Sequence, residues 1–237
     1  MRWPGSIEKL VEEQEILAAA KPPQWHPRRE PYPIGGCFIC FPRGQSGPGM
    51  EGDPAWAGAA VVASGHRITS AEAAGFAGAP YEAGLLALRE GPLLEAAVRS
   101  LPRLPEVLLV NATGRDHPRS AGLALHLGAI LDLPTIGVTH RPLLAEGKWP
   151  QLARGAHTPL VLAGRCVGYW LCTRSGKRPV AVHAAWRTDP EIAVAVLLST
   201  GADKARTPEP IRQARQIARV ARATAGTQSL PARDEAD

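Results

Sequence analysis

The chain has 237 residues, 45% of them hydrophobic, which is enough to bury one sizeable core. No apolar run is long enough to span a bilayer, and the first residues lack a signal-peptide core, so we expect a cytoplasmic protein with no membrane partner. Four cysteines are too few for a secreted disulfide scaffold. The net charge of +5 favours acidic partners such as nucleic acid.

The first predicted elements are a helix and three strands. Ser6 is expected to cap a helix that ends before Pro22-Pro23. Strands are predicted at residues 34–41 and 56–63, and a third begins at 66–69 after a turn. The first strand contains the CxxC motif Cys37 to Cys40. Residues three apart in a strand point to opposite faces, so the sequence does not favour zinc or redox chemistry there.

The centre of the chain predicts a βαβ unit. A buried strand at 107–110, a helix at 120–131 and a strand at 135–138 follow one another, with polar residues gathered after the first strand. Upstream, Glu90 precedes Gly91-Pro92 and a helix-period series, which predicts a loop-to-helix junction at Glu90. Polar residues just past the carboxyl end of such a strand are typical of active sites in α/β folds.

The last third predicts more strands and two helices. Strands are expected at 161–162, 167–173 and 178–182, and Asp189 is expected to cap a helix that begins with Pro190. Pro210 is expected to start the last helix, and residues from 226 onward are expected to be a disordered tail. Four arginines of that helix are spaced to form one basic stripe, either a phosphate-binding face or a solvated one: Arg212, Arg215, Arg219 and Arg222.

Three segments of the chain carry recognisable motifs. Residues 80–90 read Pro-Tyr-Glu-Ala-Gly-Leu-Leu-Ala-Leu-Arg-Glu, residues 111–122 contain Gly114, His117 and Gly122, and residues 134–140 read Pro-Thr-Ile-Gly-Val-Thr-His. These segments resemble the endonuclease V family. Its pattern is Pro-Tyr-hydrophobic-Pro-Gly-x-Leu-(Ala/Ser)-Phe-Arg-Glu, then Asp-Gly-x-Gly-x-x-His-Pro-Arg-x-x-Gly, then Pro-Thr-Ile-Gly-Val-(Ala)-Lys.

The resemblance implies a single α/β domain over residues 1–225, with a ribonuclease H-like mixed central sheet flanked by helices. It also implies three carboxylates that hold Mg²⁺ for phosphodiester hydrolysis at inosine-type bases in DNA or RNA. Of these, only Glu90 is present, whereas Cys37 and Asn111 stand at the other two positions. The family's lysine is His140, and a late family histidine is Trp186.

Other residues match the family's base-binding positions. Tyr81 corresponds to the wedge tyrosine that helps to hold a flipped base out of the duplex. Five further residues match positions around the base pocket, and His117 is open to a structural interpretation as well: Gly84, Leu85, Gly114, His117 and Gly122. Polar residues stand where the family has small ones: Thr113, Asp116 and His183.

Three functional hypotheses remain open from the sequence. In the first, the protein binds deaminated bases in nucleic acid and cleaves weakly or not at all. In the second, the fold carries changed chemistry on a nucleoside-like or other small substrate, with Cys37 as a thiolate and His117 or Asp116 assisting. In the third, a nuclease recruits metal through Glu90, Asn111 and Asp116. The sequence does not indicate an oligomeric state.

Overall fold

The structure is a computed structural model that describes residues 2–44, 47–200 and 205–227. Its centre is one eight-stranded sheet in the order β3-β2-β1-β4-β5-β8-β7-β6. The strands are β1 (Ile34–Cys40), β2 (Pro54–Ala63), β3 (His66–Phe76), β4 (Val107–Val110), β5 (Thr135–Thr139), β6 (His157–Leu162), β7 (Arg165–Leu171) and β8 (Val180–Ala184). The helices are α1 (Ile7–Ala19), α2 (Leu86–Arg99), α3 (Leu123–Leu131), α4 (Pro190–Ser199) and α5 (Glu209–Thr227).

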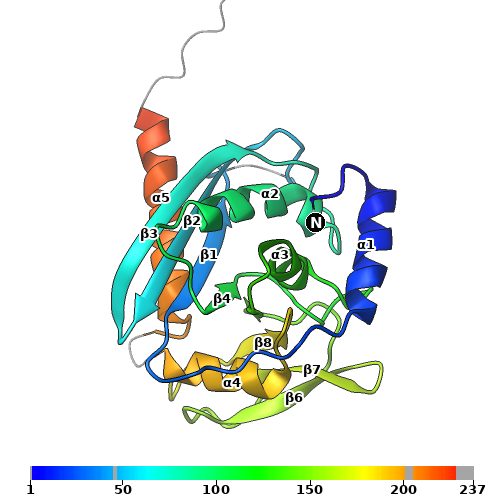
Figure 1. Ribbon diagram of the computed structural model, residues 1–237, viewed down its shortest axis with the longest axis vertical. Helices are drawn as coiled ribbons and strands as arrows, with labels where there is room; N and C mark the ends of the chain where they lie inside the picture. The colour runs from blue at the N-terminus through cyan, green and yellow to red at the C-terminus, as the bar shows by residue number, and fades with distance from the viewer. Residues whose placement is uncertain (1, 45–46, 201–204, 228–237) are drawn as a thin grey trace, which may run out of the picture.

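The sheet is mixed. Strands β1, β4 and β5 run parallel at its centre, and the remaining pairs are antiparallel. Helix α3 connects the parallel strands β4 and β5 as a βαβ unit, and α2 lies between β3 and β4 in the chain. The architecture confirms the predicted α/β class with a mixed central sheet flanked by helices (Figure 1).

Strand β4 shows why the sheet is buried on both faces. Leu108 and Val110 belong to the core under α1, α2 and α3, whereas Val107 and Leu109 belong to the core under α4 and the start of α5. Side chains alternate between faces along a strand, so a continuous apolar run packs against helices on both sides (Figure 1). Cys37 lies in the first core, while the Cys40 thiol contacts the carbonyl of Ala218 on α5. The two cysteines therefore face opposite ways, as predicted.

Both predicted helix caps are confirmed. The Ser6 hydroxyl accepts a hydrogen bond from the backbone N–H of Lys9 at 3.3 Å. The Asp189 carboxylate accepts one from Ile192 at 2.6 Å, with Pro190 in the first turn of α4. Each contact satisfies an N–H that the helix itself leaves without a partner.

The prediction of a loop-to-helix junction at Glu90 is wrong. Helix α2 begins at Leu86, so Glu90 lies inside it and Pro92 is an internal residue. Ala87, Leu94 and Ala97 are all buried along the helix, and this packing extends it upstream of the proline. Pro92 removes one backbone donor but does not end the helix.

Several boundaries also differ from the prediction. Strand β3 continues to Phe76 because small residues on one side of it, such as Ala71 and Ala73, pack on the core. Helix α3 begins at Leu123, three residues later than predicted. Helix α5 extends to Thr227, past the predicted start of the tail, and residues 228–237 lie outside the described part of the chain. No helix within the described ranges is long and apolar enough to cross a membrane.

Candidate functional site

A pocket of about 140 Å³ lies where the central parallel strands end. Asn111 directly follows β4, and Thr139 is the last residue of β5. Four of the sequence-predicted site residues line the pocket: Tyr81, Gly84, Asn111 and His117. Nine more residues complete its lining: Gln14, Ala83, Leu86, Ala87, Ala112, Thr113, Leu123, Thr139 and Leu143.

The carbonyl of Gly84 organises one side of this pocket. It accepts hydrogen bonds from Nε2 of Gln14 at 3.2 Å, from Nε2 of His117 at 3.0 Å and from Nη2 of Arg119 at 3.2 Å. Gly84 has a φ of +86°, a conformation that costs other residues energy and that glycine adopts freely. The bend that aims this carbonyl inward therefore depends on glycine.

His117 has a defined tautomer. Its Nδ1 accepts the backbone N–H of Arg119 at 3.2 Å, so the proton resides on Nε2, which donates to Gly84. Burial lowers the pKa of His117 to about 4, and this outweighs the opposing effect of the Gly84 hydrogen bond. The imidazole is neutral near pH 7 and both of its nitrogens are hydrogen-bonded, so in this arrangement His117 supports the pocket wall.

Tyr81 stands at the edge of the pocket with half of its surface exposed. Its backbone N–H donates to the carbonyl of Gly49 at 3.0 Å, which ties the tyrosine segment to the loop before β2. The backbone of Tyr81 is thus held in place, while its half-exposed ring is free to contact a ligand.

The three positions at which the family holds metal are not equivalent here. Cys37 is fully buried, and burial together with the nearby Glu90 raises its pKa above the usual range. Glu90 is partly accessible, yet burial raises its pKa to about 7 against the opposing effect of Arg89. Asn111 is exposed and contributes a neutral amide. A protonated thiol and an uncharged amide do not fit a hard dication.

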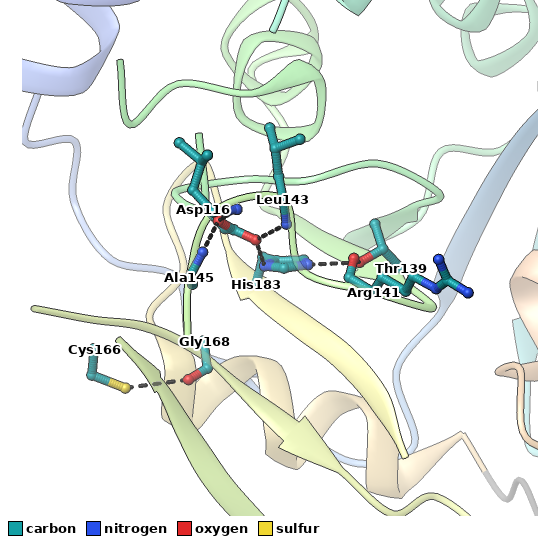
Figure 2. A network of polar contacts seen from close by, with 9 residues as sticks. Asp116, Thr139, Arg141, Leu143, Ala145, Cys166, Gly168 and His183 are labelled. Carbon is teal, nitrogen blue, oxygen red and sulfur yellow. Dashed lines mark hydrogen bonds and ion pairs between the residues drawn. The ribbon is translucent and has the colours of Figure 1, made fainter. Parts of the chain in front are cut away.

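Asp116 does not replace the missing carboxylates. It is fully buried, and its two oxygens accept the backbone N–H groups of Leu143, Leu144 and Ala145 at 2.6–2.8 Å (Figure 2). A carboxylate engaged in this way is not available to a metal. Across the described residues, no group of three His, Cys, Asp or Glu side chains is arranged to hold one.

The remaining predicted residues lie outside the pocket lining. Leu85 is buried in the core at the start of α2, and Gly122 is the residue before α3. A Cβ at Gly114 would lie 2.1 Å from the carbonyl oxygen of Ala184, so this glycine is required by the protein's own packing against β8. His140 is exposed next to Arg206, whose Nη2 faces its carbonyl at 3.5 Å.

The predicted arginine stripe on α5 is only partly observed. Arg212, Arg215 and Arg219 line one open groove of about 420 Å³. Arg212 also pairs with Glu209 at 2.9 Å, and the guanidinium of Arg215 lies 4.9 Å from the centre of the Phe38 ring. Arg222 instead donates to the carbonyl of Phe41 at 2.9 Å and is absent from the groove lining.

The pocket residues that the sequence analysis did not single out include Gln14, Thr139 and Leu143. The sequence did contain an indication for Gln14, because it is a polar residue between Leu10 and Leu17 on the buried face of α1. Thr139 follows an apolar strand in the third motif, where the family pattern has alanine. Leu143 had no signal, because its place depends on a contact with Asp116.

The fold defines an α/β protein of the ribonuclease H-like class, with a pocket at the carboxyl edge of its parallel strands. A family model described as Endonuclease V matches residues 48–216, more than half of the chain. The chain is 37% identical over 176 residues to an endonuclease V from Roseiflexus sp., covering 72% of this chain and 77% of that one. It therefore belongs to the endonuclease V family.

Solved structures support the same assignment. The Streptomyces avermitilis endonuclease V superposes with a TM-score of 0.81 at 32% identity, covering 94% of this chain and 96% of that one. The catalytic domain of human endonuclease V gives 0.79 at 28%, covering 94% and 100%. A Ciona intestinalis endonuclease V in complex with a 24mer DNA containing an inosine followed by a ribo-adenosine shares the fold, with a TM-score of 0.72 at 20% identity and coverage of 92% and 98%.

The family-model match does not include β1. The family match begins at residue 48, after β1 and therefore after Cys37. Among curated relatives, the chain is 44% identical to the endonuclease V of Methanopyrus kandleri over 59% of its own length, and it spans 60% of that relative.

Cys37 is expected to be unreactive. Treatment with iodoacetamide across a pH series should alkylate the exposed Cys166 first and leave Cys37 unmodified below pH 9, because the raised pKa and burial both suppress its thiolate. Mass spectrometry of each cysteine peptide gives the readout, with urea-unfolded protein as the control in which all four react. Selective labelling of Cys37 below pH 7 would contradict this reading of the site.

Glu90 is expected to make stability pH-dependent. Its folded pKa of about 7 lies above the ordinary 4.5, so its favourable contribution is full below pH 4.5 and is lost as the pH rises through 7. Glu90→Gln should therefore be more stable than the native chain at pH 8, and the difference should shrink at pH 5. Urea unfolding at both pH values measures this, and an equal difference at both would show that Glu90 is not held in its protonated form.

Proposed function

We propose that this protein binds inosine-type bases in nucleic acid and that its metal-dependent cleavage is weak or lost. The proposal rests on a difference between the base pocket and the carboxylate positions of the same site. The pocket is intact, with Tyr81 at its edge and the Gly84 carbonyl fixed by three donors, whereas two of three carboxylate positions hold Cys37 and Asn111.

The two missing charges weaken metal binding, and with it strand cleavage, without altering the base pocket. At an effective dielectric of about 20, one charge at about 4 Å contributes of order 4 kcal/mol to ion binding before desolvation. A third of that is about tenfold in affinity, and two such charges are absent. Glu90, with a pKa of about 7, is itself only partly ionised at neutral pH. The family's Mg²⁺ chemistry thus has no suitable donor set among these residues.

Two surfaces of the protein suit nucleic acid, one beside the pocket and one along α5. Three apolar side chains near the pocket remain exposed by 37–50%, which offers contact area to bases: Tyr81, Leu143 and Leu144. On the other face of the sheet, the arginines of α5 line a groove that suits phosphates, and the net charge of +5 acts in the same direction. That the Ciona relative binds inosine-containing DNA supports DNA as one substrate, and RNA is the other.

Cleavage of inosine-containing strands is expected to be absent or about a hundredfold below that of a relative with all three carboxylates. Cys37→Asp combined with Asn111→Asp should restore part of the Mg²⁺ affinity, because it returns both charges to the site. The measurements are strand cleavage on a denaturing gel and Mg²⁺ titration by calorimetry. Cys37→Asn is the matched control, since it changes the thiol without adding charge. Efficient cutting by the native chain at low millimolar Mg²⁺ would disprove the proposal.

The affinity for nucleic acid is expected to have two separable contributions, one from contacts with phosphates and one from contacts with the base. Replacing Arg212, Arg215 and Arg219 with Ala should reduce the salt slope by about 0.9 for each lost phosphate contact on duplex DNA. Tyr81→Ala should leave the slope unchanged and remove the preference for an inosine-containing strand over the matched adenine strand.

Fluorescence anisotropy over a salt series measures both effects. A triple variant with the same loss of charge elsewhere on the surface, Arg103, Arg165 and Lys177 to Ala, is the control. If the native chain fails to retain inosine-containing oligonucleotides even at low salt, the proposed function is wrong and the changed-chemistry hypothesis takes precedence.

A further inference from the structure

Three polar residues form a chain of contacts beside the pocket. Asp116 follows β4, Thr139 ends β5 and His183 lies in the neighbouring β8. Figure 2 shows the three side chains in series, with the segment after β5 wrapped around them. None of the three stands at a position where the family pattern has a metal-binding carboxylate.

Asp116 fixes the backbone of the segment after β5. Its Oδ2 accepts the N–H of Leu143 at 2.6 Å, and its Oδ1 accepts those of Leu144 and Ala145, both at 2.8 Å. Hydrogen bonds to an ionised acceptor are roughly twice as strong as neutral ones. Three of them from consecutive residues determine the path of this short stretch.

Thr139 and His183 hold the same segment from its other end. The Thr139 hydroxyl donates to the carbonyl of Arg141 at 2.6 Å, so it accepts from Nε2 of His183, which lies 2.9 Å away. His183 is fully buried, and its Nδ1 faces Oδ2 of Asp116 at 3.7 Å. The backbone from Arg141 to Ala145 is therefore tied to one buried cluster at four points.

The side chains of Leu143 and Leu144 do not anchor this segment, whereas that of Ala145 is buried in a core with Leu160 and Trp170. Leu143 is 37% exposed and Leu144 is 47% exposed, so burial of apolar surface contributes little to their position. Yet Leu143 and Thr139 both line the pocket. The wall that these two residues form is held in place by polar contacts to the backbone.

We propose that Asp116, His183 and Thr139 are positioning residues that fix residues 139–145 as one wall of the pocket, and that this wall sets the preference for the bound base. The second part rests on the proposed function. The first part concerns contacts between residues of the chain itself, so it stands apart from the proposed function.

The distances distinguish this role from a nucleophilic triad. A hydroxyl, an imidazole and a carboxylate in series can activate the hydroxyl if the imidazole accepts its proton and the carboxylate orients the imidazole. Here the hydroxyl proton is directed at the Arg141 carbonyl, and the separation of 3.7 Å between Nδ1 and Oδ2 exceeds a hydrogen bond. The network therefore holds a backbone segment and does not prepare a nucleophile.

Thr139→Val tests the proposal because it removes the hydroxyl and keeps the shape. Amide hydrogen exchange of the full chain without nucleic acid should become about fivefold faster at Leu143, Leu144 and Ala145, while β4 stays unchanged as the internal control. Thr139→Ser keeps a hydroxyl and should restore most of the protection. Unchanged exchange at these three amides, or an equal increase in β4, would overturn the positioning role.

The base preference is measured with the same two variants. The ratio of affinities for inosine-containing and adenine-containing oligonucleotides should fall about fivefold in Thr139→Val and recover in Thr139→Ser. If the native chain has a preference that Thr139→Val leaves intact, the wall does not set it and this inference fails. If the native chain has no preference, the proposed function and the specificity role both fail, whereas the exchange experiment still decides the positioning role.

Discussion

The carbonyl of Gly84 is the contact on which the site depends. Gln14 reaches it from α1, and His117 and Arg119 reach it from the segment between β4 and α3. Arg119 also binds the side chain of Gln14 at 2.6 Å, which closes the arrangement. One backbone oxygen thereby joins the N-terminal helix, the tyrosine segment and the central crossover. A buried polar group without a hydrogen-bond partner costs free energy, so the three donors to this carbonyl stabilise the arrangement together.

The buried acid beside the pocket, Asp116, is hydrogen-bonded to the backbone of the chain itself. In the family pattern, carboxylates converge on a metal. Here the fully buried acid is Asp116, whose oxygens are directed at the backbone of residues 143–145. Glu90 remains in its family position but lies in surroundings that favour its neutral form. Hydrogen bonds within the chain, at the Gly84 carbonyl and at Asp116, therefore stabilise the pocket.

The sequence predicted what local patterns determine. The parallel strands, the two capped helices and four pocket residues follow from apolar runs, cap chemistry and the family motifs. The predicted start of α2 was wrong. Gly91-Pro92 suggests a helix boundary, whereas the buried residues Ala87 and Leu94 extend the helix across it. The contact between Asp116 and His183 joins residues far apart in the chain, through the pairing of β5 with β8. No local pattern encodes such a contact.

The burial of Cys37 has an evolutionary consequence. Its side chain is packed without exposed surface in the core beneath α2 and α3, close to Glu90. A carboxylate acquired there alone would be desolvated beside another acid and would destabilise the fold before any metal could compensate. Substituting only Asn111, which follows β4, with Asp would add one charge but leave a metal ion with too few ligands. Each of the two substitutions is thus unfavourable by itself, so a change of this site toward three carboxylates requires both together.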